Sequence, residues 1–216
     1  MPIPRVPEPE VMDSAEEAAA YDAMDHGAVN AAFAEDFLAF AGTPGEVLDL
    51  GCGTGWIPVE IARRCDAGVV ALDASAEMLV VAGRNAGPFG GRVRLLLASA
   101  SKLPFADRSV GAVVSNSLVH HLHDPLPALR EVARVLRPGG VVFIRDLYRP
   151  DTPAEVDRLV DRYTAGETPL ARHLFAISLP ASFTVDEVRE LAAAAGLDAK
   201  VAMTSDRHWT LTAGPQ

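Results

Sequence analysis

A glycine-rich stretch at residues 47–62 constrains the fold of this chain more than any other. An apolar run reaches Asp49, glycines follow at positions 51, 53 and 55, and residues 56–62 have helical apolar spacing. This order predicts a buried strand, a tight loop and a helix. Glycine lacks a Cβ, so the loop can take positive φ and a ligand can lie against its backbone.

The spacing of these glycines limits which ligand the loop can hold. A dinucleotide fingerprint counted from Gly51 needs a third glycine where Trp56 stands, and one counted from Gly53 needs it at Pro58. A phosphate loop of the G-x-x-x-x-G-K type is also absent from the stretch. The carboxylate of Asp49 would repel a pyrophosphate and attract a cation. The loop therefore favours a nucleoside ligand that carries a positive charge and no phosphate.

S-adenosylmethionine fits this description through its sulfonium and ammonium groups. The string from Asp49 to Gly55 resembles motif I of the class I S-adenosylmethionine-dependent methyltransferases. The resemblance covers residues 46–213 and implies an α/β, doubly wound, seven-stranded and mostly parallel sheet. That sheet would have an antiparallel C-terminal hairpin and helices on both faces. The alternation of apolar runs with helical segments independently predicts a parallel sheet with right-handed crossovers.

The pattern along the chain predicts where these elements lie. The expected strands span 46–50, 69–72, 93–97, 110–115, 141–146, 199–203 and 209–213. The expected helices span 14–24, 29–42, 76–86, 126–136, 151–165 and 184–196, with an irregular segment at 166–183. We expect residues 1–44 to form an N-terminal arm and helical lid. Residues 45–216 would form the Rossmann-like cofactor-binding domain, with a cap insertion around 151–183.

In doubly wound sheets, ligands bind beyond the carboxyl ends of the strands. Asp73 follows the second strand, where its two oxygens can accept hydrogen bonds from a ribose diol. Ser99 stands where similar proteins often carry an aspartate for the adenine amino group, and Met78 either packs on adenine or fills the core. The expected S-adenosylmethionine-binding residues are Asp49, Gly51, Cys52, Gly53, Gly55, Asp73, Ala74, Met78, Ser99, Ala100, Asn116 and Ser117.

Methyl transfer from a sulfonium is an in-line displacement, for which the protein aligns the nucleophile and removes water. A base is needed only if the nucleophile carries a proton with an unsuitable pKa. His120 and His121 follow the fourth strand; one of them supplies that base, or the two residues cap the next helix or pack beneath the cofactor. Arg145 and Asp146 either bind an anionic substrate or form a salt bridge. The candidate catalytic residues are Tyr21, His120, His121, Arg145, Asp146 and His173.

Composition limits the partners of this chain. The 216 residues are 49% hydrophobic, which suffices for one core, and a net charge of −10 argues against nucleic acid. The chain shows neither a signal-peptide pattern nor a membrane-spanning run, and its two cysteines favour a reduced setting. We therefore expect a cytoplasmic protein, no membrane partner and no metal. The richness in alanine, valine, arginine and glycine indicates a bacterial source.

These observations favour a methyltransferase that acts on a small-molecule substrate. The segment that begins at Asn116 lacks the Asn-Pro-Pro-aromatic pattern of enzymes that methylate adenine or glutamine amino groups. Two alternatives remain open, a methyltransferase that acts on a macromolecule and a non-catalytic S-adenosylmethionine-binding module. An NAD-dependent enzyme is disfavoured by the glycine spacing.

Overall fold

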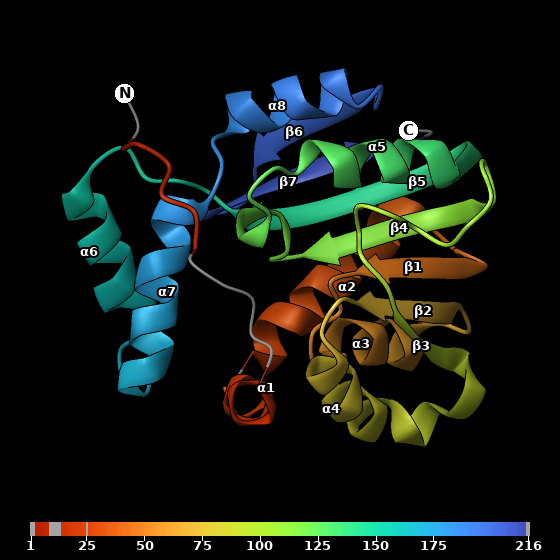
Figure 1. The fold of residues 1–216 in the computed structure, drawn as a ribbon, viewed down its shortest axis with the longest axis horizontal. Helices are drawn as coiled ribbons and strands as arrows, with labels where there is room; N and C mark the ends of the chain where they lie inside the picture. Colours follow the sequence, from red (N-terminus) through yellow and green to blue (C-terminus); the bar gives the residue numbers. More distant parts are fainter. Residues whose placement is uncertain (1–2, 9–13, 25, 215–216) are drawn as a thin grey trace.

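The computed structural model describes residues 3–8, 14–24 and 26–214, which fold around one seven-stranded sheet (Figure 1). The strand order is β3-β2-β1-β4-β5-β7-β6. The strands are β1 Glu46–Leu50, β2 Gly68–Asp73, β3 Val93–Leu97, β4 Val110–Asn116, β5 Leu136–Leu147, β6 Ala199–Met203 and β7 His208–Ala213. Neighbours from β3 to β5 pair in parallel, whereas β7 is antiparallel to β5 and β6. The predicted doubly wound sheet with its antiparallel hairpin is confirmed.

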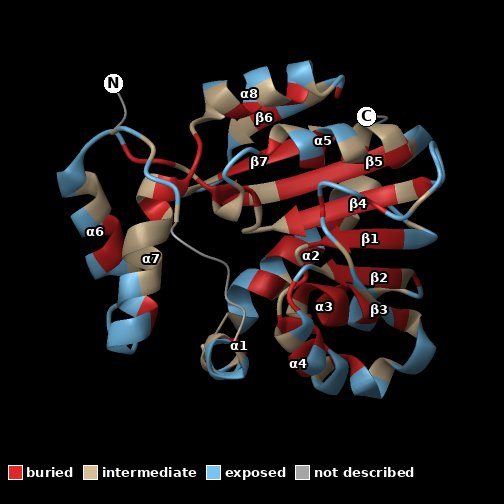
Figure 2. Ribbon diagram, in the orientation of Figure 1, coloured by how far each residue is buried: buried red, intermediate tan, exposed pale blue. Residues whose placement is uncertain are grey.

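Helices cover both faces of this sheet. They are α1 Ala15–Asp22, α2 Gly27–Ala41, α3 Trp56–Arg64, α4 Ala76–Ala86, α5 Leu126–Val135, α6 Pro153–Tyr163, α7 Pro169–Ala181 and α8 Val185–Ala194, with short 3₁₀ helices η1 Gly87–Arg92 and η2 Val119–His121. Successive side chains of a strand point to opposite faces. In β1, Leu48 therefore packs into the core under α5 and α8, whereas Val47 packs with α2 and α3. Burial on both faces explains the near-continuous apolar runs of the central strands (Figure 2).

The segment 166–183 was expected to be irregular because it contains two prolines, and this expectation is wrong. Residues Pro169–Ala181 form helix α7. Pro169 is tolerated because it occupies the first turn, where a backbone N–H has no helical partner, and Thr168 caps that turn. Pro180 lies in the last turn. Helices α6 and α7 pack on one another through a small apolar cluster, apart from the helices that flank the sheet (Figure 1).

The first described residues of the arm, 3–8, run beside the C-terminal end of α7. The amide of Val6 donates to the carbonyl of Pro180 at 3.1 Å, and the guanidinium of Arg5 donates to the carbonyl of Ala181 at 2.7 Å. The expectation of an extended arm over residues 1–13 falls in part on residues 1–2 and 9–13, outside the described residues. The capping box predicted at Ser14 and Glu17 is present at the start of α1. Among the described residues, no helix is both long and apolar enough to cross a membrane.

Gly55 gives a test of how tightly the glycine loop is built. It has φ +83°, and a Cβ built there would lie 2.9 Å from the Cβ of Ala82 on α4. We predict that Gly55→Ala lowers the free energy of unfolding in urea by about 2 kcal/mol or more, through left-handed strain and overpacking. Gly87→Ala is the control, because no atom of the described residues lies within 4 Å of its built Cβ. Equal stability of the two variants would contradict this account of the loop.

Candidate functional site

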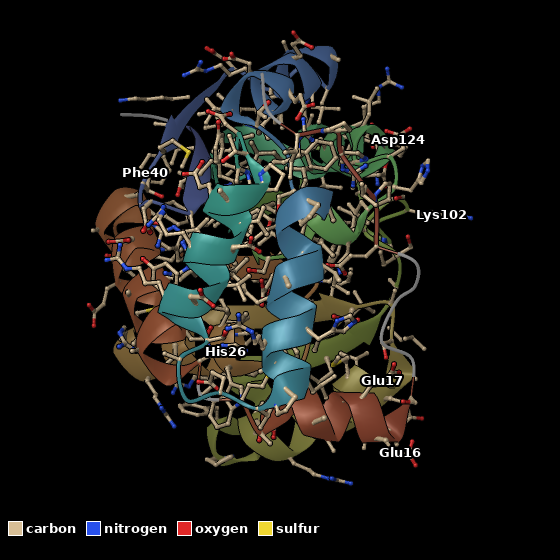
Figure 3. All side chains as sticks on the ribbon, turned by 90° about the vertical axis from the view of Figure 1, so that its left-hand side faces the viewer. Glu16, Glu17, His26, Phe40, Lys102 and Asp124 are labelled. Atoms are coloured by element: carbon tan, nitrogen blue, oxygen red, sulfur yellow. The ribbon has the colours of Figure 1, made fainter. Side chains whose placement is uncertain are left out.

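Two cavities meet at the carboxyl ends of the parallel strands. The loop cavity, about 190 Å³, is lined by the glycine loop between β1 and α3 and by the start of α4. The cap cavity, about 240 Å³, is lined by residues of α6 and α7, of the arm and of β7. The residues that line both cavities are Tyr21, Met24, His26, Asn30, Asn116, Ser117 and His121. Figure 3 faces α6 and α7, which cover the cap cavity, and labels His26 among the shared residues.

The glycine loop turns its backbone toward the loop cavity. The amide of Cys52 donates to the carbonyl of Leu72 at 2.9 Å, and the amide of Gly53 donates to Oδ2 of Asp73 at 2.8 Å. Gly53 has φ +52°, and a Cβ built there would have only the ring of Tyr21 within 4 Å, at 3.9 Å. The loop therefore leaves bare backbone beside the cavity, as the glycine pattern predicts.

Asp73 joins the loop to the next helix. Its Oδ2 accepts from the loop, and its Oδ1 accepts from the amide of Ser75 at 2.8 Å. Ser75 in turn caps α4 by accepting from the amide of Met78, which lines the loop cavity. Each carboxylate oxygen has two lone pairs, so Asp73 can still accept hydrogen bonds from a ribose diol.

Asp49 is an uncompensated carboxylate in the floor of the loop cavity. Only 1% of its surface is exposed, and its Oδ2 has no hydrogen-bond partner among the described residues. Burial, and then the negative charge of Asp73, raise the pKa of Asp49 well above its usual range. A buried carboxylate without a partner is costly. A cationic ligand in this cavity would place a positive charge beside the Asp49 carboxylate, so the site fits a nucleoside that carries a sulfonium group.

Most of the expected cofactor residues line this cavity. Those that do are Asp49, Gly51, Cys52, Gly53, Asp73, Ala74, Met78, Asn116 and Ser117. Gly55 instead supports the contact between α3 and α4, and Ser99 is exposed with its Oγ accepting from Ser101. Ala100 is buried outside the lining set. Contacts of all twelve expected residues with a cofactor stay predictions.

Several lining residues were missed by the sequence reasoning. They include Thr54, Trp56, Ile57, Ser75, Leu118 and Leu122. Trp56 follows the glycine loop directly, and its Nε1 donates to Oδ1 of Asp22 at 2.8 Å. Asn85 of α4 donates to the same oxygen at 2.8 Å. These bonds hold the end of α1 against the loop cavity, as a lid would require. The one signal in the sequence that could have indicated these residues is the position of Trp56 directly after the glycine loop.

The cap cavity has a mixed aromatic and polar wall. The guanidinium carbon of Arg207 lies 3.4 Å from the ring centroid of Tyr163, whose hydroxyl donates to Asp206 at 2.6 Å. Burial, and then the charge of Arg207, lower the pKa of His208 to about 4. His208 is therefore neutral at physiological pH, and the wall presents an aromatic and polar surface to a ligand.

His120 and Asp146 form a buried pair behind this wall. Nδ1 of His120 lies 2.5 Å from Oδ1 of Asp146, whose Oδ2 accepts from the amide of Val119 at 2.5 Å. Burial opposes the charge of both groups, but their mutual attraction and hydrogen bond raise the pKa of His120 and lower that of Asp146. Asp146 therefore fixes the η2 turn, so this pair fits the packing alternative as well as a role toward a ligand, whereas neither histidine caps α5.

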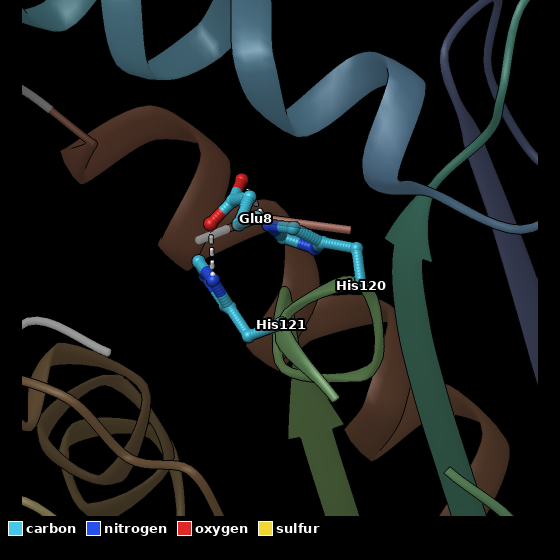
Figure 4. A group of neighbouring side chains, drawn as sticks. All are labelled: Glu8, His120 and His121. Atoms are coloured by element: carbon cyan, nitrogen blue, oxygen red, sulfur yellow. Dashed lines mark ion pairs between the residues drawn. The ribbon is translucent and has the colours of Figure 1, made fainter. Parts of the chain in front are cut away.

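The other candidate catalytic residues divide into two groups. Tyr21 and His121 lie where the two cavities join, and Nδ1 of His121 is 2.6 Å from Oε2 of Glu8 (Figure 4). Arg145 instead pairs with Asp36 at 2.8 Å and lines neither cavity. His173 is exposed on α7 and also lies outside both lining sets. The roles of all six candidate catalytic residues stay predictions.

Comparison with known proteins identifies the family. A model of the methyltransferase domain family matches residues 48–144. An O-methyltransferase of Aspergillus nomiae is 34% identical over 159 residues, which cover 71% of this chain and 70% of the relative. The chain belongs to the class I S-adenosylmethionine-dependent methyltransferases. Its methyl donor is S-adenosylmethionine, and the product of the donor is S-adenosylhomocysteine.

Other relatives align with a smaller part of their own length. A ubiquinone/menaquinone biosynthesis C-methyltransferase of Geotalea daltonii is 33% identical over 110 residues, which cover 49% of this methyltransferase and 47% of the relative. The methyltransferase thus spans about half the length of this and several other curated relatives. The relatives come from fungi and bacteria, so the bacterial source stays a prediction.

Solved structures show the same fold at low sequence identity. A candidate S-adenosylmethionine-dependent methyltransferase of Methanococcus maripaludis superposes with a TM-score of 0.76 at 20% identity, covering 98% of each chain. A phosphoethanolamine N-methyltransferase of Haemonchus contortus, solved with S-adenosyl-L-methionine, has a TM-score of 0.70 at 17% identity. That alignment covers 94% of this methyltransferase and 58% of the nematode chain. These likenesses confirm the fold.

Asp49→Asn tests the charge in the floor of the loop cavity. The pKa of Asp49 is higher in the folded protein than in the unfolded chain, so protonated Asp49 stabilises the fold at low pH. This contribution to the free energy of unfolding is lost as the pH rises through the raised pKa. We predict that the ligand-free variant loses less stability in urea than the wild type between pH 5 and pH 8. The variant should also bind S-adenosylmethionine more weakly in calorimetry, by about 1–3 kcal/mol. The exposed Asp66→Asn is the control, and unchanged cofactor affinity in Asp49→Asn would refute the charge match.

Proposed function

We propose that this methyltransferase moves the methyl group of S-adenosylmethionine to a hydroxyl oxygen of a small aromatic molecule. The observation that carries the proposal is the junction of the two cavities, where the imidazole of His121 lines both. The loop cavity would hold the methyl donor and the cap cavity would hold the acceptor. A group at the junction can then touch both reactants.

The residues of the loop cavity fit the parts of the donor in order. Asp73 would accept the ribose hydroxyls, and Met78 would pack on the adenine. Asp49 would face the cationic end, and Asn116 and Ser117 would line the methionine end, next to the acceptor. S-adenosylmethionine supplies a methyl group that the sulfonium already activates.

The protein itself would align the two reactants, exclude water from them and remove one proton from the acceptor. The lid residues Tyr21 and Met24 line the junction and would exclude water from it. The acceptor oxygen must approach the methyl carbon to about 3–3.5 Å along the line of the breaking bond. As the C–O bond forms and the C–S bond breaks, the hydroxyl proton passes to His121. An imidazole suits this step because it can accept a proton near neutral pH.

The size and wall of the cap cavity support a small acceptor. The cavity measures about 240 Å³ and lies under α6 and α7. Tyr163 and Phe175 contribute aromatic rings, which favour a planar ring in the acceptor. The net charge of −10 gives no support to a nucleic-acid acceptor. The O-methyltransferase name of several fungal relatives supports oxygen as the acceptor atom.

A carbon acceptor is the second candidate. It is favoured by the bacterial relatives named C-methyltransferases of ubiquinone and menaquinone biosynthesis. An activated ring carbon next to a phenolic oxygen would need the same proton removal. The two candidates therefore differ in the bond formed, which product analysis separates.

The test uses S-adenosylmethionine with a labelled methyl group and three acceptors: phenol, catechol and 4-hydroxybenzoate. We predict O-methylated product, and a fall in kcat of about 100-fold or more in His121→Gln with cofactor affinity retained. His123→Gln is the matched control, because His123 is exposed and lines neither cavity. Exclusively C-methylated product would favour the second candidate. Absence of methylation of all three acceptors, or wild-type kcat in His121→Gln, would refute the proposal.

A further inference from the structure

The N-terminal arm brings a carboxylate to the junction of the two cavities. Only 8% of the Glu8 side chain is exposed, and it lines the cap cavity. Its Oε2 lies 2.6 Å from Nδ1 of His121 (Figure 4). Its Oε1 accepts from Oγ of Ser178 on α7 at 2.6 Å. Nothing near Glu8 in the sequence indicates this contact, because the arm and η2 are far apart along the chain.

The arm is fastened close to Glu8 by Arg5. The guanidinium donates to the carbonyls of His120 at 3.2 Å and Leu122 at 2.8 Å, on either side of His121. It also lies 4.0 Å from the ring centroid of Phe183. One arginine thus ties the arm to the backbone of the turn that carries the histidine. This anchoring fixes the distance between the Glu8 carboxylate and the imidazole.

Glu8 is a charged acceptor in this position. Burial opposes its ionisation, but the hydrogen bond and charge of His121 and the hydrogen bond from Ser178 hold the pKa of Glu8 down at about 2. An ionised carboxylate can only accept hydrogen bonds. Nδ1 of His121 therefore carries the proton, and Nε2 has the free lone pair that a base requires.

We propose that Glu8 is a positioning residue for methyl transfer, which orients His121 and fixes its Nδ1–H tautomer so that Nε2 can take the acceptor proton. The inference rests on the proposed function, in which His121 is that base. It assigns a role in the reaction to the N-terminal arm. The carboxylate would also stabilise the imidazolium that forms when the proton arrives.

A bound metal ion is the alternative explanation for the cluster of Glu8, His120 and His121. The ligand atoms of Glu8, His120 and His121 lie within 4.8 Å of one another. An ion bound at about 2.0–2.2 Å by both Oε2 and Nδ1 would hold these atoms at least about 3 Å apart. Their separation of 2.6 Å is that of a charge-assisted hydrogen bond. The geometry therefore favours a proton between Glu8 and His121, and a bound metal is an outcome of the test.

The first experiment needs no acceptor. Long-range ¹H–¹⁵N spectra of the full chain with S-adenosylhomocysteine bound report the tautomer of each imidazole. We predict the Nδ1–H tautomer for His121 in the wild type and in Glu8→Gln, whose amide oxygen still accepts. Glu8→Leu removes the acceptor and should lose that preference. An Nε2–H tautomer in the wild type, or no change in Glu8→Leu, would overturn the inference.

The second experiment measures turnover with labelled S-adenosylmethionine and catechol. We predict that Glu8→Gln lowers kcat about tenfold or more, with the KM values for both substrates little changed. Glu190→Gln, an exposed glutamate on α8, is the matched control. In a His121→Gln background, Glu8→Gln should have almost no further effect, because Glu8 acts through His121.

The outcomes separate this inference from the proposed function. Equal losses from Glu8→Gln in both backgrounds would mean that the arm acts on the fold alone, which overturns the inference. Stimulation of the wild type by Zn²⁺ or Mg²⁺, abolished by EDTA and absent in Glu8→Gln, would overturn it in favour of a metal. A wild type that does not methylate catechol contradicts the proposed function for that acceptor. The tautomer measurement then still decides whether Glu8 positions His121.

Discussion

The site of this methyltransferase depends on one constraint, the parallel pairing of β1, β2, β4 and β5. Parallel strands bring their carboxyl ends to the same edge of the sheet. Asp49, Asp73, Asn116 and Asp146 lie at or near the ends of these four strands, although they are far apart in the sequence. Asp49 and Asp73 line the loop cavity, and Asp146 holds the histidine turn. Without this pairing, no pair of these groups would share a site.

The sequence predicts where the loop cavity lies because that cavity is built locally. The loop, its flanking strand and its helix are contiguous, and Asp73 is placed by the same topology as the loop. The strand at 46–50 and the helix at 76–86 have the predicted ends. The exceptions are Gly55, Ser99 and Ala100, which lie outside the cavity lining; Ser99 is exposed just after β3, the strand at the edge of the sheet.

The cap cavity and the residues around it could not be predicted to the same extent, for three physical reasons. Glu8 reaches His121 through a contact between distant segments, which leaves no local pattern. Arg145 and Asp146 are adjacent in β5, and strand alternation sends their side chains to opposite faces, where they find the separate partners Asp36 and His120. The helix Pro169–Ala181 was hidden because a proline in the first turn looks like a helix breaker until its N-cap is recognised.

In the proposed reaction, the donor's sulfur lies at the junction of the two cavities, beside an imidazole held by the arm. The most direct measurement is a crystal structure of the full chain with S-adenosylhomocysteine bound. We expect the ribose hydroxyls on the Asp73 carboxylate and the sulfur facing the cap cavity next to His121, with Glu8 still bonded to Nδ1 of His121. A sulfur that faces away from His121, or an adenosine seated in the cap cavity, would contradict it.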